Sequence, residues 1–310
     1  MLIIAQYAVV ASLIVTVAAL VFYVAAVFMA AKNAAPVRAK VLVSANELDD
    51  LLDDPAPASK PVTTRAQPAS GMARYGSVLT WTALGLLTVN LVVRTIATGH
   101  GPFVTQHEFA VATSWGFLAV YLFFELKFRA KTLALLLLPV TLMMQLYALS
   151  QATATDPLVP ALQNSLLLTI HIIVAIFAYG AFAVSFAAAG LYLLRGWIPE
   201  SLARVLPKPA MLDRLGYQGV IIGFPLMTAV IVFGAIWAQI AWGSYWSWDP
   251  KETISLVTWL IYGGFLHARV ARGWVGTRSA WLLVIGFASV IFTFFGNYLF
   301  GGLHSYAVGQ

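Results

Sequence analysis

Eight long apolar segments constrain the fold of this chain more than any other feature of its sequence. Each is close to or above the roughly 17 to 25 residues that a helix needs to cross a bilayer, and none alternates in the way that a membrane-spanning strand requires. Hydrophobic residues make up 61% of the chain and charged residues only 10%, which excludes a soluble globular domain. The sequence therefore predicts an all-α, polytopic membrane helix bundle with about eight transmembrane helices, over residues 3–31, 76–97, 109–126, 132–150, 166–194, 216–240, 253–270 and 279–300.

The basic residues indicate how the chain crosses the membrane. Sixteen of the eighteen lysines and arginines follow the first, third, fifth and seventh predicted helices, and such an excess is typical of cytoplasmic loops. We therefore expect both termini on the external side, and we attribute the net charge of +6 to topology and not to nucleic-acid binding. The two exceptions, Arg94 and Lys251, are candidates for pairing with an anionic ligand on the external side.

The chain divides into three predicted parts. Residues 1–31 lack a basic n-region and are too long for a signal-peptide core, so we expect a retained transmembrane helix. Residues 32–75 are rich in alanine and proline and carry an acidic patch, which favours a flexible cytoplasmic linker. Residues 76–310 then form a seven-helix domain. Because the chain has no cysteine, it cannot form a disulfide, a thiolate metal site or a covalent c-type haem of its own.

An aromatic motif, residues 242–252, separates the sixth and seventh predicted helices with the sequence WGSYWSWDPKE. Asp249 is placed as the N-cap of the next helix, with Pro250 first and Glu252 third, so a capping box explains the carboxylates. An interfacial belt would explain aromatic residues in general, but not three indoles within seven residues beside this charged group. The motif favours a site for a large, flat ligand with a polar edge, with its aromatic members at Trp242, Tyr245, Trp246 and Trp248.

Two histidines are expected at the same external depth as this motif. His171 lies about five residues into the fifth predicted helix, roughly 8 Å along its axis, and His304 follows the eighth helix by four residues. A single membrane histidine is as typical of a helix-packing hydrogen bond as of a metal ligand. Two neutral imidazoles beside a group of indoles, however, form an arrangement that suits a haem iron.

The other three histidines are assigned separately. His267 lies fifteen residues after Glu252, roughly 22 Å along a helix, so it cannot share an iron with the external pair. It either packs or snorkels at the inner face, or belongs to a second site whose other ligand comes from another protein. His100 and His107 flank an external loop; we interpret His107 as solvated, and His100, with Arg94, as a candidate to line an external cavity.

Four segments resemble the CcsA/ResC family of System II cytochrome c biogenesis proteins. These are GHGPF after the second helix, WGSYWSWDPKET, LVTWLIYGGFLHARV and the C-terminal FFGNYLFGGLHSYA. The resemblance covers about Arg94 to Tyr306, and it includes the Trp-rich "WWD" signature of haem-handling proteins. It implies a multi-pass protein of the plasma or thylakoid membrane, with the WWD motif outside.

The resemblance also implies a function. Such a protein works with a CcsB/ResB-type membrane partner, receives haem b, and attaches it to apocytochrome c as a cytochrome c synthase; an external thiol-reducing protein is a further expected partner. His171 and His304 would be the external axial ligands, and His267 one ligand of a transmembrane haem whose other ligand the partner supplies. The haem-contacting signature would be Trp242, Trp246, Trp248 and Asp249.

One departure and two alternatives accompany this interpretation. Where the family often has Tyr-Glu after GHGPF, this chain has His107-Glu108, so the role of His107 stays open. A bis-His electron-transfer cytochrome b and a transporter of another amphiphile are the alternative functions. Within the haem hypothesis, Lys251 or Arg94 would pair with the haem propionates.

Overall fold

The computed structural model describes residues 1–33, 70–101, 104–153, 162 and 166–304, and within these ranges all regular secondary structure is helical. The predicted linker lies largely outside the described residues. Eight of the helices are long and apolar enough to cross a membrane, which confirms the predicted all-α fold. The elements are α1 Leu2–Asn33, α2 Ser70–Thr98, α3 Gln106–Phe128, η1 Lys131–Leu133, α4 Ala134–Ser150, α5 Leu166–Leu194, α6 Glu200–Ala203, α7 Pro209–Trp242, α8 Pro250–Arg272 and α9 Thr277–Leu299.

Several helices extend beyond the predicted apolar segments. α7 begins seven residues before the predicted 216, and α2 begins six before the predicted 76. Hydropathy marks only the stretch that suits the hydrocarbon core, whereas a helix continues until its backbone is capped or broken. α7, for example, begins at Pro209, at the first helical position that favours proline.

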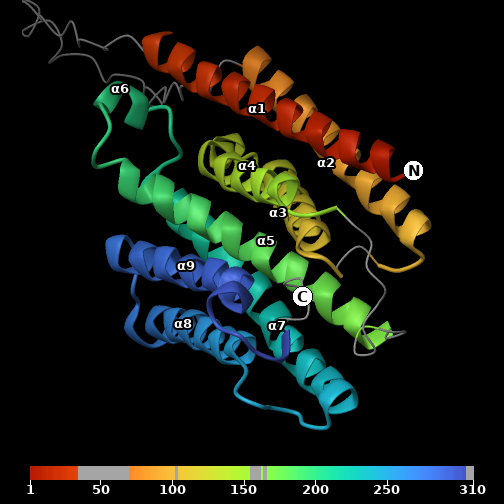
Figure 1. Cartoon of the computed structure of the whole chain (residues 1–310). Coiled ribbons are helices and arrows are strands. Elements are labelled where there is room, and N and C mark those ends of the chain that lie inside the picture. Colours follow the sequence, from red (N-terminus) through yellow and green to blue (C-terminus); the bar gives the residue numbers. More distant parts are fainter. Residues whose placement is uncertain (34–69, 102–103, 154–161, 163–165, 305–310) are drawn as a thin grey trace, which may run out of the picture.

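Helix α5 occupies the middle of the bundle (Figure 1). The α3 and α4 helices lie on one side of it and α7, α8 and α9 on the other, while α1 and α2 form an outer pair beside α3 and α4. α5 and α7 approach closely because small residues face each other: a Cβ added to Gly219 would lie 2.7 Å from the Ala181 carbonyl oxygen. The Ser185 hydroxyl also donates to the Gly216 carbonyl across this interface, at 2.9 Å. Such contacts are typical of tight helix pairs in membranes.

The first helix is packed into the bundle. The Ser12 hydroxyl donates to the Ala83 carbonyl of α2 at 3.0 Å, and the Asn90 amide donates to the Ala5 carbonyl at 2.7 Å. The Gln145 amide of α4 donates to Ser12 at 3.2 Å. Polar contacts of this kind hold membrane helices together where apolar burial cannot. α1 is therefore in direct contact with the domain that the sequence division placed at residues 76–310.

A buried carboxylate completes this attachment. Glu125 of α3 accepts hydrogen bonds from the hydroxyls of Tyr23 at 2.8 Å and Tyr121 at 2.6 Å, and from that of Ser77. The ammonium of Lys131 lies 3.5 Å away. These partners come from α1, α2, α3 and η1, so one carboxylate joins four elements, and its charge is compensated as burial requires.

The Tyr23 hydroxyl is predicted to stabilise the fold measurably. In detergent, Tyr23→Phe should lower the free energy of unfolding by about 1–2 kcal/mol, because it removes one hydrogen bond to a buried charged group. Tyr7→Phe is the matched control on the same helix, because Tyr7 is 70% exposed; its effect should stay within about 0.5 kcal/mol. Equal effects of the two changes in a denaturant titration would contradict this account of α1.

Candidate functional site

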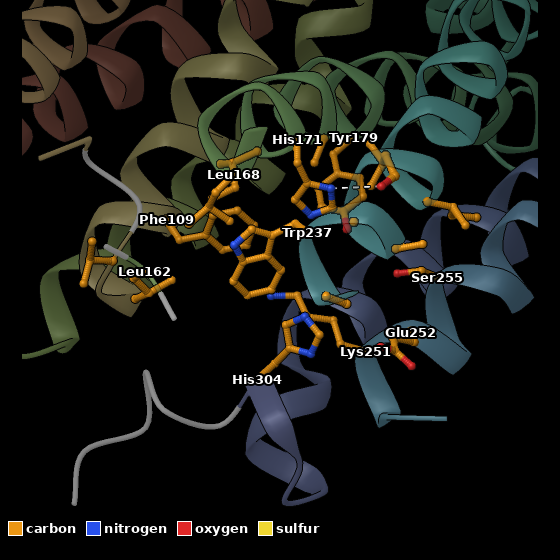
Figure 2. Close-up of a pocket in the computed structure, with 18 of the residues that line it drawn as sticks. Phe109, Leu162, Leu168, His171, Tyr179, Trp237, Lys251, Glu252, Ser255 and His304 are labelled. Atoms are coloured by element: carbon orange, nitrogen blue, oxygen red, sulfur yellow. Dashed lines mark hydrogen bonds between the residues drawn. The ribbon is translucent and has the colours of Figure 1, made fainter. Parts of the chain in front are cut away.

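A cavity with about 1040 Å³ of empty space, part of it open to the outside, lies at one end of the bundle. Its walls come from the loop and first turn at the start of α3, the first half of α5, the last turns of α7, the aromatic motif, the start of α8 and His304 (Figure 2). Most of the lining is apolar, with a few polar groups, as is typical of small-molecule sites. Because the 1040 Å³ includes space open to solvent, it is an upper bound on the room for a ligand.

His171 enters this cavity from α5 with a defined orientation. Its Nδ1 lies 2.9 Å from the carbonyl oxygen of Val230 on α7. A carbonyl can only accept, so Nδ1 carries the proton and Nε2 carries the lone pair. One turn further along α7 is Gly234, where an added Cβ would lie only 2.8 Å from Cε1 of His171. The imidazole can therefore pack closely against α7 because position 234 has no side chain.

His304 is held by Asp249. Its Nδ1 lies 2.7 Å from Oδ1 of Asp249, whose Oδ2 accepts a hydrogen bond from the backbone N–H of Leu303 at 2.6 Å. The same carboxylate caps α8 by accepting from the N–H of Lys251 at 2.9 Å, and the predicted capping box with Glu252 is confirmed. Asp249 thus joins the start of α8 to the chain segment after α9.

The electrostatics of this pair favour a neutral imidazole on an ionised carboxylate. Burial acts to raise the pKa of Asp249, but the hydrogen bonds from His304, Lys251 and Leu303 outweigh it and hold that pKa well below its usual range. Burial lowers the pKa of His304, with the Asp249 hydrogen bond opposing it. Near neutral pH the Nδ1–H of His304 therefore donates to Asp249 and Nε2 carries the lone pair, the same tautomer as at His171.

The aromatic motif divides into three roles. Tyr245 and Trp246 line the cavity. Trp242 packs edge-on against His304, with ring centroids 4.8 Å apart and planes at 78°. Trp248 points outward: it is 69% exposed and meets Trp246 at right angles, with centroids 5.6 Å apart. Only some of the signature indoles, therefore, face the cavity.

Trp248 also has an unusual backbone. Its φ of 59° lies in the left-handed region, where a bulky side chain costs about 1–2 kcal/mol. This turn allows the backbone N–H groups of Ser247 and Asp249, on either side of it, to donate to the same Oε2 of Glu252, at 2.8 and 3.3 Å. The strained residue therefore belongs to the turn that places Asp249.

Trp237 is a cavity residue that the sequence did not identify. It lies on α7 five residues before Trp242, with ring centroids 4.7 Å apart, and its centroid is 6.2 Å from that of His304. In the view of Figure 2 its indole lies between the imidazoles of His171 and His304. Its position within a continuous apolar segment gave no sign of this role.

Lys251 contributes the cavity's positive charge. Its side chain lines the cavity, with the ammonium 5.2 Å from the centroid of the Phe109 ring. Among the residues that the structure describes, no ion pair joins this ammonium to a carboxylate. A partly buried cation with no carboxylate partner among these residues favours an anionic group on the ligand.

Two predicted cavity residues lie elsewhere. Arg94 is buried and pairs with Glu108, with 2.5 Å between Nε and Oε1, and it also donates to the Thr153 carbonyl at 3.2 Å. His100 contacts the carbonyl of Gly101 through Nδ1 at 2.9 Å. Neither residue lines the cavity, so the expectation that they do is wrong. Glu108, fourteen residues along the chain, already compensates the Arg94 charge.

The interpretation of His107 as a solvated loop residue is also wrong. His107 lies in the first turn of α3, is 0% exposed, and has Nδ1 2.8 Å from the Ala148 carbonyl of α4. His267, in contrast, is exposed on α8, two residues before Arg269, which pairs with Asp213 at 2.6 Å. His267 does not line the cavity. This agrees with the prediction that it lies too far along the helix to share an iron with His171 and His304.

Comparisons with known proteins identify the family of this chain. Residues 104–304 match the family described as cytochrome C assembly protein. The chain is 33% identical to the cytochrome c biogenesis protein CcsA of Guillardia theta, over 75% of this chain and 84% of that protein. It is 36% identical to CcsA of Gloeobacter violaceus, over 72% and 84%, and 34% identical to CcsA of a Synechococcus strain, over 77% and 87%.

These matches include the start of α3, the α5–α7 pair, the aromatic motif and His304, which together form the cavity. They also agree with the multi-pass helical fold. The chain therefore belongs to the cytochrome c assembly protein family, and its function is in cytochrome c biogenesis.

Proposed function

We propose that the cavity is an external haem site in which His171 and His304 are the two axial ligands of haem b. The observation that carries this proposal is the matched state of the two imidazoles. Each contacts an acceptor through Nδ1, the Val230 carbonyl in one case and Asp249 in the other, so each has its lone pair on Nε2. A histidine that ligates a metal usually has this kind of acceptor on its other nitrogen.

The remaining lining suits the rest of a porphyrin. Trp237, Tyr245 and Trp246 provide flat apolar surface, and the Lys251 ammonium would pair with a propionate. The membership of a cytochrome c assembly family leaves no need for the alternatives of an electron-transfer cytochrome b or an unrelated transporter.

The proposed reaction is the covalent attachment of this haem to apocytochrome c, with the protein acting as a cytochrome c synthase. Each thiol of a Cys-x-x-Cys-His segment adds across one vinyl group of the haem: the sulfur bonds to one vinyl carbon, the hydrogen goes to the other, and nothing leaves. The thiols must be reduced, which calls for an external thiol-reducing protein. The site contributes mainly position, which can supply a large part of the rate.

The proposal extends to partners and location. The distribution of basic residues supports placing the cavity and both termini outside a plasma or thylakoid membrane. His267, exposed near the inner end of α8, would be one ligand of a second haem whose other ligand comes from a CcsB/ResB-type partner. Haem would enter there before it reaches the external cavity.

The ligand assignment predicts the spectra of two single variants. In the purified protein with its partner, His171→Ala and His304→Ala should each lose most of the low-spin haem absorption, because each removes one axial ligand, and added imidazole should restore it. A low-spin spectrum unchanged by both substitutions would refute the assignment. The half-buried His100, outside the cavity, provides the control variant His100→Ala, which should keep the spectrum.

Gly234 is predicted to be necessary for the His171 geometry. Gly234→Ala should reduce haem occupancy about 10- to 100-fold, the usual cost of disturbing a ligand's support, because the new methyl group displaces the imidazole. Gly264→Ala on α8 is the matched control, since nothing lies within 4 Å of its added Cβ. Occupancy is read from haem absorbance per mole of protein, and an equal loss in both variants would indicate general destabilisation instead.

Lys251 is predicted to recognise a propionate and not the porphyrin plane. Lys251→Met should weaken the binding of haem about tenfold, close to 1.4 kcal/mol, and should leave the binding of haem dimethyl ester unchanged, because the ester has no carboxylate. The measurement is a pair of haem titrations followed by absorbance. The same loss for both ligands would show that Lys251 acts through packing.

A further inference from the structure

The two proposed ligands are held in different ways. We infer that His304 is the ligand that the acceptor's histidine replaces, and that His171 stays on the iron throughout. This inference rests on the proposed function, since a covalently attached haem must exchange one protein imidazole for the histidine of the Cys-x-x-Cys-His segment. The structure distinguishes the two candidates by what would have to move.

His171 is held on a helix that packs closely against α7. It belongs to the hydrogen-bonded backbone of α5, and Val230 and Gly234, which it meets on α7, lie one turn apart on that helix. Further along, α5 and α7 approach so closely that Gly219 could not accept a Cβ without displacing the Ala181 backbone. The backbone of His171 could therefore move away from the iron only through unwinding of α5 or separation of the two helices.

His304 belongs to a short segment that follows the end of α9 at Leu299. Hydrogen bonds to the Asp249 carboxylate join this segment to α8 at two points, the Leu303 N–H and the His304 ring. A Cβ at Gly302 would collide with the same carboxylate, so the segment lies directly on it. Release of the imidazole requires at least the loss of these two bonds and of its ring contacts with Trp237 and Trp242, but it requires no unwinding of a membrane-spanning helix.

The segment also lies at the surface. Gly301 and Gly302 are exposed, Leu303 is 44% exposed and Phe300 is 49% exposed. A peptide can therefore reach the His304 side of the cavity from outside by displacing a few residues. Asp249 acts in this scheme as a positioning residue, since it holds the ring in its ligand tautomer and holds the segment in place until the acceptor arrives.

Methionine variants can show on which side exchange occurs. Haem-loaded His304→Met and His171→Met proteins, with the partner present, should each have His/Met ligation with a methionine-to-iron charge-transfer band. The probe is an apocytochrome c peptide carrying Ser-x-x-Ser-His, which has the histidine but cannot form thioethers. It should abolish the band in His304→Met and leave it in His171→Met. Free imidazole is the control, because it should abolish the band in both.

The outcomes separate this inference from the proposed function. Loss of the band in His171→Met, alone or together with the other variant, would overturn the inference, as would a peptide without effect on either. If the wild-type protein has no bis-histidine haem, the proposed function itself fails.

Asp249→Asn provides a second test in the otherwise unaltered chain. Asparagine caps helices as well as aspartate does, so α8 should keep its start, but its neutral side chain should hold His304 less strongly. The rate at which the Ser-x-x-Ser-His peptide enters the iron coordination should rise about tenfold, which corresponds to roughly 1.4 kcal/mol. Gly264→Ala, on the same helix but outside the cavity, should not change this rate. An unchanged rate in Asp249→Asn would contradict the assigned role of Asp249.

Discussion

The Asp249 carboxylate is the group on which the geometry of the site depends. It caps α8, accepts the His304 ring and accepts the Leu303 backbone. Each contact satisfies a different need: the cap stabilises a helix terminus, the ring bond selects a tautomer, and the backbone bond fixes the last described segment. Because all three use one residue, the aromatic motif and the C-terminal segment form one structural unit although 54 residues separate Asp249 from Leu303.

The opposite side of the cavity is built on another principle. Between α5 and α7, His171 is held without a charged partner. Glycine and small side chains allow the two backbones to approach, and the Val230 carbonyl has a second lone pair that accepts a hydrogen bond from His171. One ligand therefore stands on a rigid helix pair and the other on a hydrogen-bonded surface segment. A site that must hold haem firmly and then release it to an acceptor requires such a difference between its two sides.

Much of the fold and part of the candidate site could be predicted from the sequence, because the sequence signals for them were local or periodic. Apolar length predicted the eight membrane helices, the Asp-Pro-Lys-Glu order predicted the capping box, and position along the chain placed His171 and His304 at one end of the bundle. The predicted domain boundaries and the orientation in the membrane stay predictions.

The failures have a common physical cause, which is that they depend on contacts between distant segments. Arg94 was expected to be available because its partner, Glu108, lies across a loop, and His107 was interpreted as solvated because a polar residue in the first turn of a helix gives no sign of burial. Gly234 acts by the absence of a side chain, so no residue pattern predicts its role. A predicted external position, therefore, did not distinguish a cavity residue from a buried one.

The central claim is that one haem iron lies between His171 and His304. A cryo-electron microscopy structure of the haem-loaded protein with its membrane partner tests this most directly. The account predicts iron coordinated by Nε2 of both residues, with a propionate beside Lys251 and the Asp249–His304 hydrogen bond intact. Haem located elsewhere, or coordinated in this cavity by other residues, would contradict it.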